Sequence, residues 1–248
     1  MRPLILIALP VLLSFSACSV LKGKPAERAG FIPNVLTLKD DRERSPYHGV
    51  WFADEDQFYK RMDECNKIAV LPVRTDFLLA KGWWSSLNEI ESSSYEKEVG
   101  ELATYFKQEL ERALKEHPKN RWEIVEEPDD STFILEYALV EVIATKVHIN
   151  AAGTALGAFV TGGGLVSATA GGSVAFEAKI YDGRDGELLA ALADRETDKV
   201  SVVSLRDYTF YGHSRQAIRE WAEQSAELAN TSRETQVGDS YPINLSPW

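Results

Sequence analysis

SVAFEAKIYDGRDGELLAALADR, residues 173–195, is the stretch that decides the fold. Its first half alternates apolar and charged side chains, which is typical of a strand with one buried face. The side chains expected to point inward are Val174, Phe176, Ala178 and Ile180, and those expected to lie in water are Glu177 and Lys179. Because the Asp- and Gly-rich residues 182–186 lead into a second apolar run, the stretch predicts a β-hairpin.

Two other stretches repeat apolar residues at helical spacing. In the first, Ser93 stands three residues before Glu96 as a capping box, and Pro118 ends the pattern. The second lies near the C-terminus and is marked by Ile218, Trp221, Ala222, Ser225 and Leu228. One face of each predicted helix is therefore expected in the core.

Three further stretches, at 67–73, 122–125 and 132–149, are predicted as strands. In the last, Glu136 and Glu141 fall on opposite faces, so a bulge near Leu139 would be needed to keep both carboxylates in water. The order strand, helix, strands, helix predicts an α+β fold, with a largely antiparallel sheet and two amphipathic helices packed on one face.

The N-terminus is typical of an export signal. Arg2 supplies a positive charge, and residues 4–13 form an apolar stretch too short to cross a bilayer permanently. Phe15-Ser16-Ala17 then leads to Cys18. An ordinary secretory signal cleaved near Ala17 is the alternative interpretation.

The end of this signal resembles the bacterial lipobox, with Phe15 in place of the usual Leu. The resemblance implies cleavage before Cys18 and its lipidation by diacylglycerol and a further acyl chain such as palmitate. Several chains on one cysteine anchor a protein stably. Since Ser19 and not Asp follows, the resemblance implies sorting to the outer membrane, with the chain facing the periplasm.

These signals divide the chain into four parts. Residues 1–17 are predicted to be the lipoprotein signal peptide and residues 18–29 a polar tether. Residues 30–229 are predicted to form a single periplasmic α+β domain, which begins with an extended lead-in up to Phe52 whose apolar side chains pack onto the surface. Residues 230–248 show no periodicity and are predicted to be a mobile tail.

Charge and cysteine content narrow the class of protein. The net charge of −11 disfavours nucleic acid and anionic lipid headgroups as partners of the surface as a whole. Cys65 is the only cysteine besides Cys18, so a lipidated chain would have no internal disulfide. We expect Cys65 to be a small buried apolar residue, with a reactive or dimer-forming thiol as the alternative.

Four motifs in order, at 30–36, 67–73, 134–142 and 172–191, resemble the uncharacterised bacterial lipoproteins of domain-of-unknown-function family 3313. The strand at 67–73 is also similar to that of the curli-secretion lipoproteins, periplasmic α/β proteins that assemble into rings. The first family has no assigned activity and no catalytic residues that could be transferred to this chain. The second implies that the chain could form a homo-oligomer.

No pattern of catalytic or metal-binding residues stands out. The four histidines lack a partner at metal-ligand spacing, and the Asp-rich turn at 182–187 lacks the spacing of a calcium loop. The glycines at 162–164 are not followed by the Lys-Ser/Thr pair of a phosphate loop. We therefore expect no catalytic site, no metal and no cofactor.

Two segments are candidates for interaction with a partner. Trp83 and Trp84 could bind a partner or the membrane edge, or could cover the edge of the sheet. Residues 151–176 contain no charged side chain and seven glycines, among them Gly162, Gly163 and Gly164. This uncharged segment could be a transmembrane helix, a membrane-inserting β-hairpin, or a glycine-rich connection that is mobile or packs against a neighbouring subunit.

The sequence as a whole favours a non-enzymatic envelope protein. The leading hypothesis is an outer-membrane-anchored periplasmic lipoprotein that serves as a binding or assembly module for an unknown envelope protein. The alternative is an oligomeric pore or secretion component that uses residues 151–176. An enzyme is the third hypothesis, and it would need a site built from Asp, Glu and Tyr residues.

Overall fold

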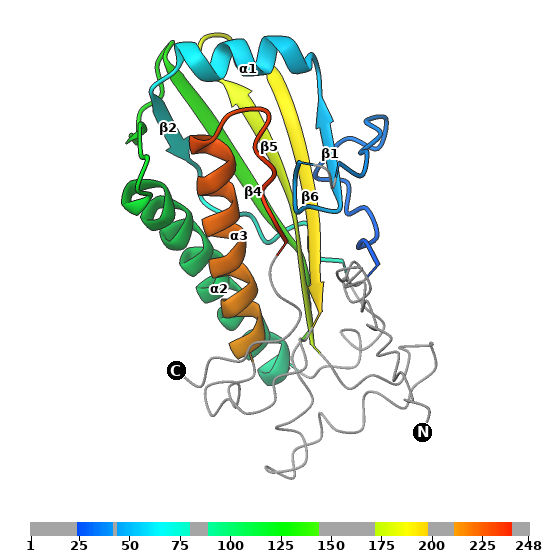
Figure 1. Cartoon of the computed structure of the whole chain (residues 1–248). Helices are drawn as coiled ribbons and strands as arrows, with labels where there is room; N and C mark the ends of the chain where they lie inside the picture. Colours follow the sequence, from blue (N-terminus) through cyan, green and yellow to red (C-terminus); the bar gives the residue numbers. More distant parts are fainter. Residues whose placement is uncertain (1–23, 42–43, 80–88, 144–171, 198–210, 240–248) are drawn as a thin grey trace, which may run out of the picture.

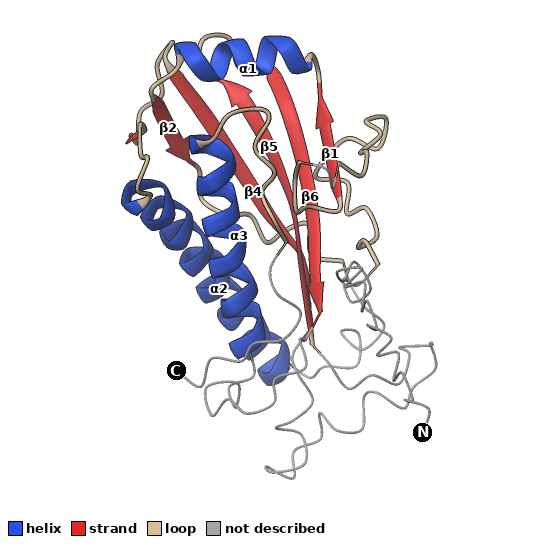
Figure 2. Ribbon diagram, in the orientation of Figure 1, coloured by secondary structure: helices blue, strands red, loops and turns tan. Residues whose placement is uncertain are grey.

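The computed structural model describes residues 24–41, 44–79, 89–143, 172–197 and 211–239. It is an α+β fold, as predicted, in which three helices lie on one face of a sheet (Figure 1 and Figure 2). In chain order the elements are β1 (Gly49–Phe52), α1 (Glu55–Glu64), β2 (Lys67–Val70), α2 (Glu89–Glu116), β3 (Glu123–Ile124), β4 (Thr132–Ile143), β5 (Ser173–Asp182), β6 (Leu188–Thr197) and α3 (Gly212–Asn230).

The sheet is mixed, and its strands lie in the order β1-β6-β5-β4-β2-β3. β1, β6, β5 and β4 are antiparallel neighbours, which includes the predicted hairpin of β5 and β6. β2 runs parallel to both β4 and β3. The prediction of a largely antiparallel sheet therefore fails on this side, because the crossover through α2 returns the chain in the direction of β2.

The main core lies between the sheet and the helices. Phe106 of α2, Phe176 of β5 and Trp221 of α3 are all almost completely buried. The ring of Phe106 lies 5.9 Å from the ring of Phe176 and 5.9 Å from that of Trp221. The inward face predicted for the hairpin and the apolar faces predicted for 93–117 and 218–228 thus meet in one cluster.

The third helix, α1, was missing from the prediction of two helices. Asp54 caps it, since its side chain accepts a hydrogen bond of 2.9 Å from the backbone of Gln57. Only three of its residues are buried, Phe58, Arg61 and Met62. A short apolar stripe on a ten-residue helix gives little periodic signal in the sequence.

The predicted start of α2 was also wrong. The helix begins at Glu89, so Ser93 and Glu96 lie inside it and do not form a capping box. A capping residue needs non-helical backbone, which Ser93 does not have. The predicted end is confirmed, because the last helical residue is Glu116.

The other face of the sheet is covered by the segment before β1, which joins the last residues of the predicted tether to the predicted lead-in and is called the lead-in below. Phe31 and Ile32 are buried there against small residues of the central strands, Ala138, Ala175 and Ala191. Glu177, predicted to lie in water, is 2% exposed. Its carboxylate accepts hydrogen bonds from the backbone N–H groups of Ala29 (3.0 Å) and Ile32 (2.7 Å). Pattern alone could not reveal that a distant segment covers this face.

The predicted bulge in β4 is confirmed, since the pairing with β5 shifts between Leu139 and Glu141. The expectation that Glu141 lies in water is wrong, because this side chain is 3% exposed. It accepts hydrogen bonds from Ser173 Oγ (2.6 Å) and Arg195 Nε (2.7 Å). The strand is described to Ile143, and the rest of the predicted strand lies outside the described residues.

Candidate functional site

The residues predicted for lipidation and for interaction with a partner are not among those that the structure describes. Cys18, Trp83, Trp84 and the three glycines Gly162, Gly163 and Gly164 all lie outside the described residues. Their roles in lipidation and interaction stay predictions. Cys65, in contrast, is described and buried, as predicted.

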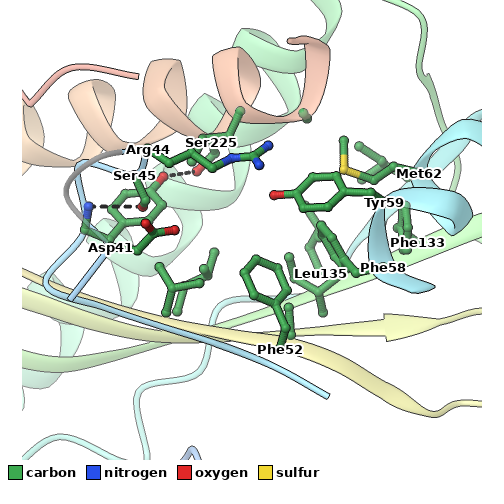
Figure 3. Close-up of a pocket in the computed structure, with 18 of the residues that line it drawn as sticks. Asp41, Arg44, Ser45, Phe52, Phe58, Tyr59, Met62, Phe133, Leu135 and Ser225 are labelled. Atoms are coloured by element: carbon green, nitrogen blue, oxygen red, sulfur yellow. Dashed lines mark hydrogen bonds between the residues drawn. The ribbon is translucent and has the colours of Figure 1, made fainter. Parts of the chain in front are cut away.

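The described residues do enclose a cavity, of about 100 Å³, between the sheet, α1 and the C-terminal half of α3 (Figure 3). Strands β1, β4, β5 and β6 form one wall, and the end of α2 also contributes. Figure 1 shows α1 crossing the end of the sheet near this place. The cavity therefore exists only because elements from most of the chain meet there.

Aromatic side chains dominate one wall of the cavity. Phe52 of β1 and Phe58 of α1 have ring centroids 5.0 Å apart, and Phe58 stacks on Phe133 of β4 at 5.7 Å. Tyr59 meets Phe58 edge to face at 5.3 Å. Aliphatic side chains such as Leu135 complete the lining. Such a surface favours contact with hydrocarbon over contact with water.

The hydroxyl groups inside the cavity bond to one another. Tyr47 Oη lies 2.8 Å from Ser225 Oγ, and Tyr137 Oη lies 3.2 Å from the same oxygen. Burial raises the pKa of Tyr47 well above its ordinary value and the pKa of Tyr137 to about 12. Both phenols therefore stay protonated and neutral at physiological pH.

Two charged side chains and a tyrosine lie at the mouth of the cavity. We define this mouth as Asp41, Arg44 and Tyr59, three lining residues that are each partly exposed. The Arg44 guanidinium lies 4.2 Å from the centroid of the Tyr59 ring. Burial raises the pKa of Tyr59 to about 12, although Arg44 acts in the opposite direction. The mouth thus presents a guanidinium beside a phenol that remains protonated.

A second arginine lies next to this mouth. Arg233, just after α3, is 5.2 Å from the centroid of the Tyr59 ring and forms ion pairs with Glu55 (3.0 Å) and Asp56 (2.5 Å) of α1. Farther on, the backbone N–H of Val237 donates to the carbonyl of Arg44 at 2.9 Å. Residues 231–239 therefore connect α1 with the lead-in beside the cavity.

Sequence reasoning missed this site entirely. Its residues come from segments far apart in the chain, and most of them read simply as core residues. The aromatic trio Phe52, Phe58 and Tyr59 around the unpredicted helix α1 was the one signal that pointed toward it. A cavity depends on how packed side chains fail to fill space, which periodicity does not report.

A buried polar cluster lies beside the main core. Asp194 accepts hydrogen bonds from Trp221 Nε1 (2.8 Å) and from the backbone N–H of His48 (3.0 Å). His48 Nδ1 lies 2.5 Å from the same carboxylate. These contacts connect β6 to α3 and to the lead-in. No group of His, Cys, Asp or Glu residues in the described part of the chain has the arrangement of a metal site.

Fold and site together define a class: an α+β domain with a mixed six-stranded sheet, helices on one face, and an apolar cavity whose mouth is charged. Residues 61–225 match the family described as "Protein of unknown function (DUF3313)". The chain belongs to this family, which confirms the resemblance seen in the sequence. No curated protein matches the chain.

Two solved structures show a distant likeness. A PelC dodecamer from Paraburkholderia phytofirmans is 9% identical, with 68% of this chain and 91% of that chain covered and a TM-score of 0.36. The hypothetical protein CT253 from Chlamydia trachomatis is 12% identical, with 66% and 98% covered and a TM-score of 0.36. At these TM-scores, neither likeness defines a shared fold or role.

Within the described ranges, no helix combines the length and the apolar character that a membrane-spanning helix needs.

Proposed function

We propose that the chain is an outer-membrane-anchored periplasmic lipoprotein that serves as a non-enzymatic binding module. In this proposal Cys18 carries the lipid, the residues that follow it form the tether, and the α+β domain faces the periplasm. The apolar cavity is the binding site. An envelope protein is the expected partner, and the chain itself could form a homo-oligomer.

The observation that carries the proposal is the lining of the cavity. Ligand sites are typically concave and apolar, with a few polar groups that set orientation. The aromatic wall and the charged mouth at Asp41 and Arg44 match this description. A core that served stability alone would gain from filling the space, because each unfilled void loses packing contacts.

The polar groups inside the cavity support binding over catalysis. A general acid or base must exchange protons near neutral pH. The raised pKa values of Tyr47 and Tyr137 hold both phenols protonated, and Ser225 is engaged with both. These groups are suited to close the inner end of the site.

Replacing Cys18 by Ser tests the anchor. We expect the wild-type chain in the outer membrane, with an acyl mass on its N-terminal peptide, and the variant released into the soluble periplasmic fraction. Cys65→Ser is the matched control and should leave the anchor unchanged, because Cys65 lies in the core. A variant that stays in the outer membrane, together with a wild-type peptide without acyl mass, would overturn the proposal.

A second candidate, an oligomeric pore or secretion component, draws support from the ends of β4 and β5. Their antiparallel pairing continues to Ile143, which precedes the uncharged segment, opposite Ser173, which lies within its last four residues. A membrane β-hairpin would need such a base, because every backbone group in lipid must be paired. The pairing favours this form of the candidate over a transmembrane helix.

Single cysteines placed along residues 151–171 of the Cys65→Ser variant separate the two candidates. A connection on the periplasmic side would let all of them react with a water-soluble thiol reagent in intact cells, which is the result we expect. If every cysteine is protected from the reagent in intact outer membranes and reacts after detergent extraction, the pore becomes the favoured candidate.

A further inference from the structure

We infer that the cavity binds the end of a single acyl chain whose anionic head group pairs with Arg44 at the mouth. This inference rests on the proposed binding function and names the class of ligand. The two possible sources are a free fatty acid and the acyl chain of an anionic membrane lipid. Both share the same chemistry, an apolar chain joined to a negative head.

The interior of the cavity determines what can enter it. Apolar cavities of about 150 Å³ in proteins stay dry and bind small hydrocarbons such as benzene. The volume of about 100 Å³ is on that scale, so it suits a few methylene groups and not a whole lipid. Since Tyr47, Tyr137 and Ser225 already bond to one another, the inserted part has no polar partner to gain. It must therefore be apolar.

The mouth determines what the other end of the ligand carries. The guanidinium of Arg44 rests on the Tyr59 ring, and its charge helps to lower the pKa of Glu234 without a close ion pair between them. A guanidinium presents a rigid set of donors that matches a carboxylate or a phosphate. Arg233, the neighbouring arginine, is already engaged by Glu55 and Asp56. Of the two arginines beside the Tyr59 ring, Arg44 is therefore the one less engaged by carboxylates and better placed to meet an anionic head.

The other two residues at the mouth, Asp41 and Tyr59, restrict the charge and the hydrogen bonding of the head group. Asp41 adds a negative charge, which disfavours a head with several negative charges. Tyr59, protonated at neutral pH, can donate a hydrogen bond to the same head. Because the cavity is small and opens at this mouth, the part of the ligand that does not fit inside lies at the mouth, beside Arg44. A monoacyl amphiphile with one negative charge satisfies these conditions.

The test uses the full chain carrying Cys18→Ser, which needs no detergent, after removal of bound lipid on a hydrophobic resin. The fluorescent fatty acid cis-parinaric acid, whose tail is an unbranched hydrocarbon chain, is titrated first. Dodecanoic acid, 1-dodecanol and lysophosphatidylglycerol then compete for it. The acid and the alcohol share one chain and differ in charge, whereas the lysolipid represents a membrane source.

Two variants separate the head from the chain. Arg44→Gln should weaken dodecanoic acid about tenfold and leave 1-dodecanol unchanged, because only the acid loses a charged partner. Arg184→Gln, an exposed arginine outside the lining, is the matched control and should change neither. Ala190→Leu adds carbon atoms to a buried lining position and should weaken every ligand at least tenfold. If Ala190→Leu lowers the midpoint of thermal unfolding, Leu192→Phe is used in its place as the variant that fills the cavity.

Chain length gives an independent measurement. Affinity should rise about fourfold for each added methylene until the cavity is full and then level off. Equal binding of acid and alcohol would overturn the role of Arg44. Probe binding that ignores both cavity-filling variants, or no binding at all, would overturn the inference. Fractionation of the wild-type chain, run alongside, tests the anchored location separately.

Discussion

At the scale of single residues, a buried ion pair holds α1 to the sheet. Arg61 donates to both carboxylate oxygens of Asp182, at 2.7 and 2.8 Å, and to the carbonyl of Asp130 at 2.9 Å. Burial alone would raise the pKa of Asp182, but the hydrogen bonds from Arg61 and from the backbone of Arg184 lower it overall. The carboxylate is therefore charged in the folded state at neutral pH.

Replacing Arg61 by Met should lower the free energy of unfolding at pH 7 by about 3 to 5 kcal/mol, because it leaves the carboxylate of Asp182 buried and without its partner. The double variant Arg61→Met/Asp182→Asn should recover part of this loss. Urea unfolding of the three proteins at pH 7 measures both effects. A double variant as unstable as the single one would mean that the charge of Asp182 is not the cause.

The same pair predicts a pH dependence. Because the folded-state pKa of Asp182 is lowered, its contribution to stability is present above the unfolded pKa of about 4 and is lost as pH falls through the folded value. The double variant should therefore lose less stability than the wild type as the pH falls from about 5 to about 2. Equal losses in both proteins would contradict the assignment to Asp182.

Phe106 provides a residue-scale test of the main core. The side chain is completely buried, and its ring contacts those of Tyr137 (5.1 Å) and Trp221 (5.9 Å). Phe106→Ala should cost about 3 to 5 kcal/mol, because it removes apolar contacts and leaves a void. Leu78, partly buried at the edge of the same cluster, gives a control: Leu78→Ala should cost less. A loss below about 1 kcal/mol for Phe106→Ala would place this residue outside the stabilising core.

At the scale of elements, the lead-in behaves as an additional layer on the sheet. Three contacts hold it: the two backbone hydrogen bonds to Glu177, the ion pair of Arg28 with the same carboxylate at 3.3 Å, and the apolar cluster around Phe31. The Lys179 ammonium, 4.0 Å from the centroid of the Phe31 ring, adds a cation–π contact. The carboxylate of Glu177 on β5 thus binds the lead-in, a segment far away in the sequence, to the sheet.

Glu177→Gln should loosen this layer while leaving the main core intact. The amide keeps one acceptor oxygen but turns an NH₂ group toward a backbone N–H, which costs about 1 to 3 kcal/mol for the group left without a partner. Hydrogen exchange at the amides of Ala29 and Ile32 should accelerate, and proteases should cut within 24–38. The exposed Glu187, replaced by Gln, is the control. Unchanged exchange in Glu177→Gln would show that the apolar contacts alone hold the lead-in.

At the scale of the whole molecule, one sheet supports two different surfaces. The helices cover the face that holds the large aromatic core (Figure 1). The lead-in covers the face lined with alanines. The cavity lies on the helix-covered face, where side chains do not fill all of the space between the helices and the sheet. It is next to the point where α1, α3 and the residues after α3 meet. This position leaves the central aromatic packing intact while one end of the domain stays available to a ligand.

The sequence by itself determined the features that depend on local periodicity. The hairpin of β5 and β6, the buried faces of α2 and α3, and the bulge at Leu139 all follow from side-chain spacing over a few residues. The predicted export signal ending before Cys18 likewise rests on adjacent residues alone. Short elements such as β1 and α1 were not predicted, because four and ten residues are too few to show a clear periodicity of apolar side chains.

Only the tertiary structure decided which strands became neighbours and which charges became buried. β1 lies at the edge of the sheet because Val50 pairs with Leu192, a partner far along the chain, and β2 runs parallel to β4 because of the α2 crossover. Glu177 is buried because the lead-in folds over it and supplies its hydrogen-bond donors. The cavity depends on the packing of several elements at once, so no single stretch of sequence specifies it. The physical reason is the same in each case: local pattern determines which side of a strand or helix is apolar, whereas long-range contacts determine what covers that side.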